Sequence, residues 1–246
     1  SSPVSLCPRS AFRLLRRKDS AFALLMPVYA GIYQPYDFAF CYQKHVYEMP
    51  LEKLTVPKPS GNLVTARYHS YDAALFEDVY AALAEKYNGL PVRTDFQWNK
   101  LLQVHQLEKM QAVVVYHGDE PRGYMFCKIT EDRTFLIQEL VALTPDAKWT
   151  LLYFARAHQA SSDKLYWEAA EDDLTYLEFA DADLSGRCRP FMMARCFNAC
   201  GALLRYDVPA ACPDGEITVL LKDTLLEENN STVVLRADNG MLTLEQ

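Results

Sequence analysis

The sequence predicts an α+β protein, and three observations lead to that fold class. The chain has 246 residues, of which 50% are hydrophobic and 12% aromatic, which is enough apolar material for a folded core. Short apolar or alternating runs, typical of strands, are interspersed with segments whose apolar residues recur at helical spacing. At roughly 150 residues per domain, the length predicts one large domain or two ordinary ones.

The first part of the chain predicts a strand, a short helix and a second strand. Residues 9–18 fit a short basic helix, and residues 21–26 form an apolar run that ends at a proline. Such a run is typical of a strand that is buried on both faces. Residues 29–36 predict a short aromatic turn or helix whose length is limited by Pro35, and the alternation over 38–47 predicts a strand or hairpin.

A second group of elements follows a linker predicted over residues 58–71. Asp72 can cap a helix that ends near residue 88, and a second helix is predicted over 94–109. Residues 112–127 contain two apolar runs around a turn with good hairpin chemistry.

The pattern then continues with a strand, a helix and another strand. Residues 135–143 predict the first strand, and residues 144–158 a helix with proline in its first turn. Residues 165–167 predict a short strand. The acidic stretch 168–183 is interpreted as a solvated loop and helix face.

The last part predicts a helix followed by strands. Residues 191–197 are interpreted as a helix that Gly201 interrupts. Residues 216–221, 231–236 and 241–244 predict strands, the last two joined by a hairpin turn.

Charge and cysteine usage exclude several classes. The net charge is −7, whereas general nucleic-acid binding needs a basic face, so no nucleic-acid partner is expected. No apolar run reaches the ~20 residues of a membrane span. The seven cysteines show no CxxC pair and no zinc spacing, so we expect free thiols, no metal and a cytoplasmic location.

The order of elements in the middle of the chain is similar to that of the GNAT acyl-CoA N-acetyltransferases. In a working GNAT fold, a basic, glycine-rich turn after the central strand holds the pyrophosphate of the donor. The equivalent stretch here, residues 144–149, has no glycine, loses an N–H to Pro145 and places Asp146 where phosphate would lie. This middle unit is therefore expected not to bind acetyl-CoA.

Three stretches in order resemble the Eis-like (enhanced intracellular survival) acetyltransferases. They are Gly31-Ile32-Tyr33-Gln34-Pro35-Tyr36-Asp37-Phe38; Arg122-Gly123-Tyr124 with Glu139-Leu140; and Phe191-Met192-Met193-Ala194-Arg195 followed by Asp223 and Asn229-Asn230. The resemblance implies tandem GNAT-like units followed by the start of a sterol-carrier-like domain, incomplete at both ends. Its segments would be the end of a first GNAT domain (1–57), the linker (58–71), a degenerate second GNAT domain (72–186) and a partial sterol-carrier-like domain (187–246).

The resemblance implies an N-acetyltransferase that uses acetyl-CoA and acts on a primary amine of an aminoglycoside, polyamine or lysine side chain. It implies a homo-oligomer, often a hexamer, and it leaves this chain inactive if the acetyl-CoA loop is missing. In the family, the tyrosine at the position of Tyr33 is the general acid towards the leaving thiolate, whereas the residues alone also allow a packing role for Tyr33. The catalytic base and the residues that bind acetyl-CoA stay unassigned. The alternative is a non-catalytic binding or assembly protein built from degenerate units.

Overall fold

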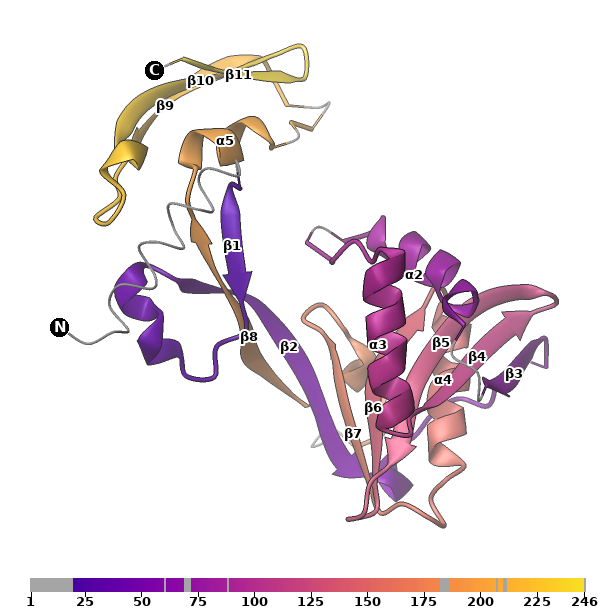
Figure 1. The fold of residues 1–246 in the computed structure, drawn as a ribbon. Helices are drawn as coiled ribbons and strands as arrows, with labels where there is room; N and C mark the ends of the chain where they lie inside the picture. The colour runs from indigo at the N-terminus through magenta and orange to yellow at the C-terminus, as the bar shows by residue number, and fades with distance from the viewer. Residues whose placement is uncertain are drawn as a thin grey trace. The chain divides into compact units, whose positions relative to one another are not determined.

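The computed structural model describes residues 20–59, 61–68, 72–87, 89–181, 186–206, 208–209 and 212–245. The helix expected over residues 9–18 lies outside them. The chain divides into two compact units, which are described separately. Unit 1 consists of Ser1–Gln43 and Pro190–Gln246, and unit 2 of Lys44–Arg189 (Figure 1). The segments 1–57, 58–71, 72–186 and 187–246 were inferred from sequence, and this assignment of domains stays a prediction.

Unit 2 is built on a mixed sheet whose strands follow the order β2-β7-β6-β5-β4-β3. The strands are β2 (Ala39–Pro50, which begins in unit 1), β3 (Leu63–Tyr68), β4 (Gln111–His117), β5 (Glu120–Ile129), β6 (Thr134–Ala142) and β7 (Lys164–Ala170). The pair β6–β7 is parallel, and the other described pairs of this sheet are antiparallel. The parallel pair requires a crossover connection, which the helix between β6 and β7 supplies.

Helices cover both faces of this sheet. The helices are α2 (Glu77–Ala84), α3 (Asp95–Leu107) and α4 (Pro145–Arg156). Helices α2 and α3 lie on one face and α4 on the other (Figure 1). In β4, Ala112 and Val114 pack in the cluster under α2 and α3, whereas Val113 and Val115 pack in the cluster under α4. Burial on both faces explains why this strand reads as a continuous apolar run.

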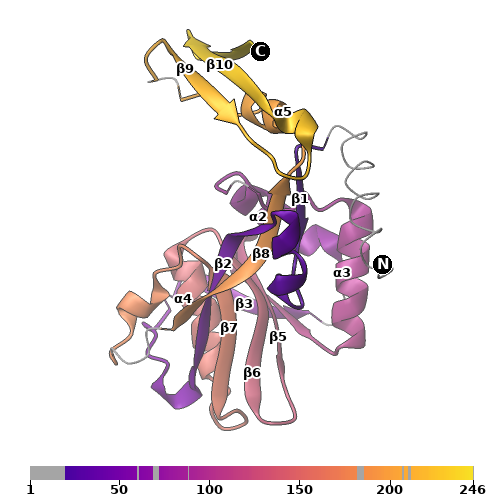
Figure 2. The same cartoon turned by 90° about the vertical axis from the view of Figure 1, so that its left-hand side faces the viewer.

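Unit 1 contains a strand pair, two short helices and a small antiparallel sheet. Strand β1 (Phe22–Leu25) pairs antiparallel with β8 (Arg187–Cys196). The small sheet has the order β11-β10-β9, with α5 against it (Figure 2). Its elements are α5 (Ala199–Leu204), β9 (Gly215–Leu221), β10 (Ser231–Asp238) and β11 (Met241–Glu245). The 3₁₀ helices are η2 (Ala30–Ile32) and η3 (Gln34–Tyr36).

The interpretation of residues 191–197 as a helix is wrong, because residues 191–196 belong to strand β8 and Phe197 directly follows it. Met193, Arg195 and Phe197 are buried, and the residues between them are partly exposed. This period of two is that of a strand. Pairing of β8 with β1 therefore decides the structure against the helical preference of methionine, alanine and arginine.

Two other expectations need correction. The strand over residues 21–26 is not buried on both faces, because the side chains of Phe22 and Leu24 are 51% and 49% exposed. Ala23 and Leu25 alternate with them and pack against a buried cluster of unit 1. Within the segment 58–71, residues 63–68 form strand β3, whose pairing with β4 the sequence pattern missed. Gly201, expected to interrupt a helix, lies within α5, which the sequence did not predict as a separate element. The other helices and strands predicted within the described residues are confirmed, with shifted ends.

Candidate functional site

Unit 2 contains a cavity of about 470 Å³ where β6 and β7 diverge. The pairing of β6 with β7 begins at Thr134 opposite Lys164 and ends at Ile137 opposite Trp167. The residues that line the cavity begin at the end of this pairing. The apolar walls include Leu140 of β6, Trp167 of β7 and Trp149 of α4. A site of this size with apolar walls and few polar groups is typical of a small-molecule pocket.

One side of the cavity carries a polar cluster centred on Asp173. Its carboxylate accepts hydrogen bonds from the Tyr47 hydroxyl (2.6 Å) and the Thr175 backbone N–H (2.9 Å). The Lys148 ammonium lies 3.2 Å from Asp173 Oδ2 and donates to Thr175 Oγ1 at 2.8 Å. Lys148 and Asp173 therefore neutralise each other within the wall.

The surroundings of Asp173 keep it charged and keep Tyr47 protonated. Burial would raise the pKa of Asp173, but hydrogen bonds from Thr175 and Tyr47 and the charge of Lys148 outweigh it and lower that pKa. Burial, followed by the hydrogen bond to Asp173, raises the pKa of Tyr47. The interpretation of residues 168–183 as a solvated face is therefore wrong for Asp173. No spacing in the sequence connects Asp173 with Tyr47 or Lys148.

The first turn of α4, beside the cavity, uses several of its anion-binding groups within the protein. Thr144 is the N-cap, and its Oγ1 accepts a hydrogen bond from the Ala147 N–H at 3.2 Å. The Lys148 N–H donates to the Thr144 carbonyl, and Pro145 has no N–H. Among the described lining residues, Lys148 is the one basic group, and Asp173 already neutralises it. Pro145 and Ala147 therefore offer the pyrophosphate of a CoA ester no free N–H, and the cation of the cavity is already paired.

Tyr33, the predicted catalytic residue, lies in unit 1 between η2 and η3. It is the C-cap residue of η2 and the N-cap residue of η3, and η3 has a proline in its first turn. Its half-buried ring meets the Phe38 ring edge-on, with the centroids 5.9 Å apart. Phe38 forms a small core with Met193 and Phe197. Within the described part of the chain, no hydrogen bond engages the Tyr33 hydroxyl. Tyr33 therefore has both a packing contact and a hydroxyl able to donate a proton.

A second polar cluster joins Asp37, which is near Tyr33 along the chain, to Arg195 and Asp223. These residues belong to the stretches that resemble the Eis-like family, but no spacing predicted that they pair. Arg195 forms ion pairs with Asp37 and Asp223 at 3.0 and 2.9 Å. The interpretation of residues 191–197 as a helix concealed it, because helical spacing gives Arg195 no particular inward direction. In the strand, the alternation with Met193 and Phe197 directs Arg195 inward.

The described residues contain no group of three or more histidine, cysteine, aspartate or glutamate residues able to hold a metal ion. Among the described helices, none is both long enough and apolar enough to cross a bilayer.

Comparisons with known proteins agree with this architecture. Residues 89–196 match the family described as the acetyltransferase (GNAT) domain. None of the curated proteins matches the chain.

Three solved structures are similar over nearly the whole chain. A probable N-acyltransferase of unknown function from Enterococcus faecalis is 20% identical, with a TM-score of 0.87, over 99% of this chain and 62% of its own. A GCN5-related N-acetyltransferase from Anabaena variabilis is also 20% identical, with a TM-score of 0.81 and the same two coverages. Eis1 from Mycobacterium abscessus is 16% identical, with a TM-score of 0.72, over 96% of this chain and 61% of its own.

The chain thus spans about three fifths of the length of these structures. At this level of identity, the similarity defines the fold. The described chain has an α+β GNAT fold, with the acetyltransferase (GNAT) domain match over residues 89–196.

Proposed function

We propose that this chain is part of an N-acetyltransferase that transfers the acetyl group of acetyl-CoA to a primary amine. The observation that carries the proposal is the match of residues 89–196 to the acetyltransferase (GNAT) domain. The similarity to Eis1 from Mycobacterium abscessus supports an Eis-like arrangement. That arrangement consists of tandem GNAT-like units, the first one partial, followed by a sterol-carrier-like segment.

The acceptor in this proposal is an aminoglycoside, a polyamine or a lysine side chain, and the protein works as a homo-oligomer. The donor does not bind in the cavity of unit 2, because its helix N-terminus is capped by Thr144 and its lysine is paired with Asp173. The site for acetyl-CoA therefore belongs outside this cavity.

The proposed chemistry is direct transfer. The neutral amine attacks the thioester carbonyl, the C–S bond breaks and the CoA thiolate leaves. The acceptor ammonium, with an ordinary pKa of about 10.4, must first lose a proton, and the group that removes it is not assigned.

Tyr33 is the proposed general acid that protonates the departing thiolate. A phenol with an ordinary pKa of about 10 keeps its proton at neutral pH, and desolvation makes the thiolate a stronger base. The edge-on contact with Phe38 orients the ring, while its hydroxyl is not used by any described neighbour.

Acetyl transfer by the natural full-length protein tests the function. The assay follows release of the CoA thiol with an aminoglycoside, a polyamine and a lysine peptide as acceptors. Turnover with at least one amine supports the proposal. No turnover, together with no binding of acetyl-CoA, favours the alternative of a binding or assembly protein.

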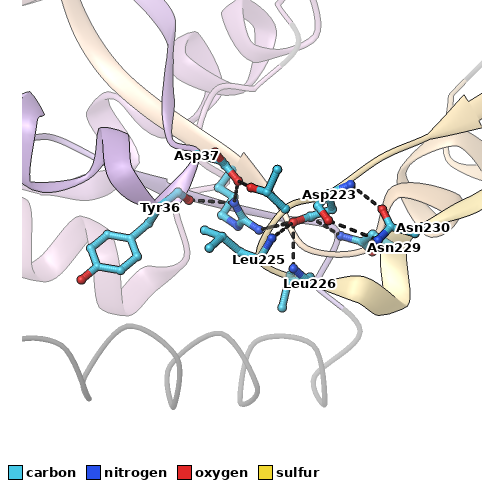
Figure 3. A network of polar contacts seen from close by, with 9 residues as sticks. Tyr36, Asp37, Asp223, Leu225, Leu226, Asn229 and Asn230 are labelled. Atoms are coloured by element: carbon cyan, nitrogen blue, oxygen red, sulfur yellow. Dashed lines mark hydrogen bonds and ion pairs between the residues drawn. The ribbon is translucent and has the colours of Figure 1, made fainter.

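Replacement of Tyr33 tests its role. Tyr33→Phe removes one hydroxyl and little packing, so the fold and the affinity for acetyl-CoA should be kept. General-acid catalysis contributes about 10²–10⁴ in rate, so kcat should fall by that factor. Tyr36→Phe is the matched control, because the Tyr36 ring points away from the nearby polar contacts (Figure 3). If Tyr33→Phe keeps more than about a tenth of kcat, the hydroxyl is not the acid.

A further inference from the structure

The guanidinium of Arg195 connects three segments of unit 1. Arg195 lies in β8 and is 3% exposed. Its Nη1 donates to the carbonyl of Tyr36 at 2.7 Å and to Asp37 Oδ2 at 3.0 Å (Figure 3). Its Nη2 donates to both carboxylate oxygens of Asp223, at 2.9 and 3.1 Å. One planar group therefore joins the end of η3 to the loop that follows β9.

The Asp223 end of this contact is itself fixed. The backbone N–H groups of Leu225 and Leu226 donate to Asp223 Oδ1, and Asn229 Nδ2 donates to Oδ2 (Figure 3). Burial would raise the pKa of Asp223, but these bonds and the Arg195 charge outweigh it and lower that pKa. Asp223 is therefore a charged and immobile anchor for Arg195.

The other end of the contact leads directly to Tyr33. Tyr36 is the last residue of η3, and its N–H donates to the Tyr33 carbonyl at 2.9 Å. Asp37 follows with a φ of 59°, in the left-handed region. Thr224 Oγ1 also donates to Asp37 Oδ2, at 3.0 Å. The turn that carries Tyr33 is thus held at its carboxyl end by Arg195.

We propose that Arg195, anchored by Asp223, is a positioning residue that holds the turn of Tyr33 in the geometry for proton transfer. The inference rests on the proposed function, because it takes the Tyr33 hydroxyl as the general acid. A purely structural Arg195 would stabilise unit 1 without affecting the chemical step through Tyr33.

Two variants weaken the contact to different degrees. Arg195→Lys keeps the charge but cannot reach Tyr36, Asp37 and Asp223 at once, because a lysine ammonium lacks the planar fork. Asp37→Asn removes one exposed carboxylate and keeps a side chain that tolerates a positive φ, so it folds even if Arg195→Lys does not. Arg236→Lys is the matched control, since Arg236 pairs with Glu216 and Glu245 on an exposed part of the small sheet.

The kinetic experiment is a double-mutant cycle in the natural full-length protein. A misplacement of about 1 Å costs up to about 10² in rate, so Arg195→Lys should lower kcat by about 10- to 100-fold, with KM for acetyl-CoA little changed. Asp37→Asn should lower kcat less, and Arg236→Lys should leave it unchanged. In the Tyr33→Phe background, Arg195→Lys should have no further effect on kcat. If Arg195→Lys instead lowers kcat by the same factor in the Tyr33→Phe background as in the unchanged protein, the inference is overturned.

A spectroscopic readout separates this inference from the proposed function. Fluorotyrosine is incorporated, and the ¹⁹F resonance missing from Tyr33→Phe identifies Tyr33. Arg195→Lys and Asp37→Asn should shift or broaden this resonance, and Arg236→Lys should not. A Tyr33 resonance that none of the variants moves would overturn the positioning role, even if acetyl transfer is found. If Arg195→Lys and Asp37→Asn move the Tyr33 resonance but Tyr33→Phe leaves kcat unchanged, the result instead contradicts the role of Tyr33 as the general acid.

Discussion

At the scale of single residues, His105 in α3 is buried without a hydrogen-bond partner for either ring nitrogen among the described residues. It is 4% exposed and its ring lies 4.5 Å from that of Phe126. Burial lowers the pKa of His105, although the nearby carboxylates of Glu139 and Glu108 oppose this effect, and Arg93 and Lys128 add to it. The folded protein therefore keeps this ring neutral at a pH where the unfolded chain already binds a proton.

This difference predicts the pH dependence of stability. Because the unfolded state binds the extra proton, the free energy of unfolding should fall as pH decreases below the ordinary histidine value of about 6.5. Urea unfolding of His105→Leu at pH 7.5 and 5.5 should show a smaller change between the two pH values than the unchanged protein. His117→Gln, at an exposed position, is the control. Equal pH dependence in His105→Leu and the unchanged protein would show that His105 is not responsible.

Contacts between polar side chains that are distant along the chain could not be predicted from the sequence. Tyr33 is predicted through a resemblance that also includes Arg195 and Asp223, but these two residues are 28 residues apart along the chain and no pattern pairs them. Asp173 and Tyr47 are 126 residues apart. Such pairs form only when the fold brings them together, and no periodicity encodes them.

At the scale of elements, the start of α3 is attached to the sheet by an ionic cluster. Arg93 forms a two-bond contact with Glu139 of β6, and the Tyr124 hydroxyl of β5 also donates to Glu139. The Arg93 guanidinium lies over the rings of Tyr80 and Trp98, at 4.0 and 4.7 Å from their centroids. The cluster therefore joins α2, α3 and two strands.

Removal of its central carboxylate should loosen these elements. Glu139→Gln leaves Arg93 without its charge partner in a half-buried position, and such losses cost about 3 kcal/mol in the free energy of unfolding. Tyr124→Phe, which removes one hydrogen bond, should cost only about 1 kcal/mol. Chemical denaturation measures both. A Glu139→Gln variant no less stable than Tyr124→Phe would contradict this role.

The elements also show where sequence patterns succeed and where they fail. The two-sided apolar run of β4 and the Thr144-Pro145 start of α4 were predicted, because local spacing and capping decide them. Strand β8 was missed because its identity depends on pairing with β1, a partner about 170 residues away. Strand β3 was missed because proline and glycine beside it suggested only a linker.

At the scale of the whole molecule, unit 1 exposes an apolar surface along β1 and the turn after it. Its exposed members are Phe22, Leu24, Met26, Tyr29 and Ile32. Large exposed apolar patches on soluble proteins mark interaction sites. Together with the homo-oligomer of the proposed function, this surface favours association between copies of the chain.

Association should therefore depend on this surface. The protein should sediment as an oligomer, and Leu24→Lys should shift it toward the monomer because it places a charge within the apolar patch. Val92→Lys, at an exposed valine of unit 2, should leave the oligomer unchanged. A monomer at all concentrations in analytical ultracentrifugation would exclude the proposed association.

At this scale, residues 44–189 have the GNAT fold, and we expect them to lack a site for the CoA ester. Thr144 caps the helix that would hold the pyrophosphate, and Asp173 neutralises Lys148, the one cation among the described lining residues. Calorimetric titration of acetyl-CoA into a folded fragment of residues 44–189 tests this claim most directly. We predict no binding at donor concentrations of about 100 μM, whereas micromolar binding, about −8 kcal/mol, would contradict the claim.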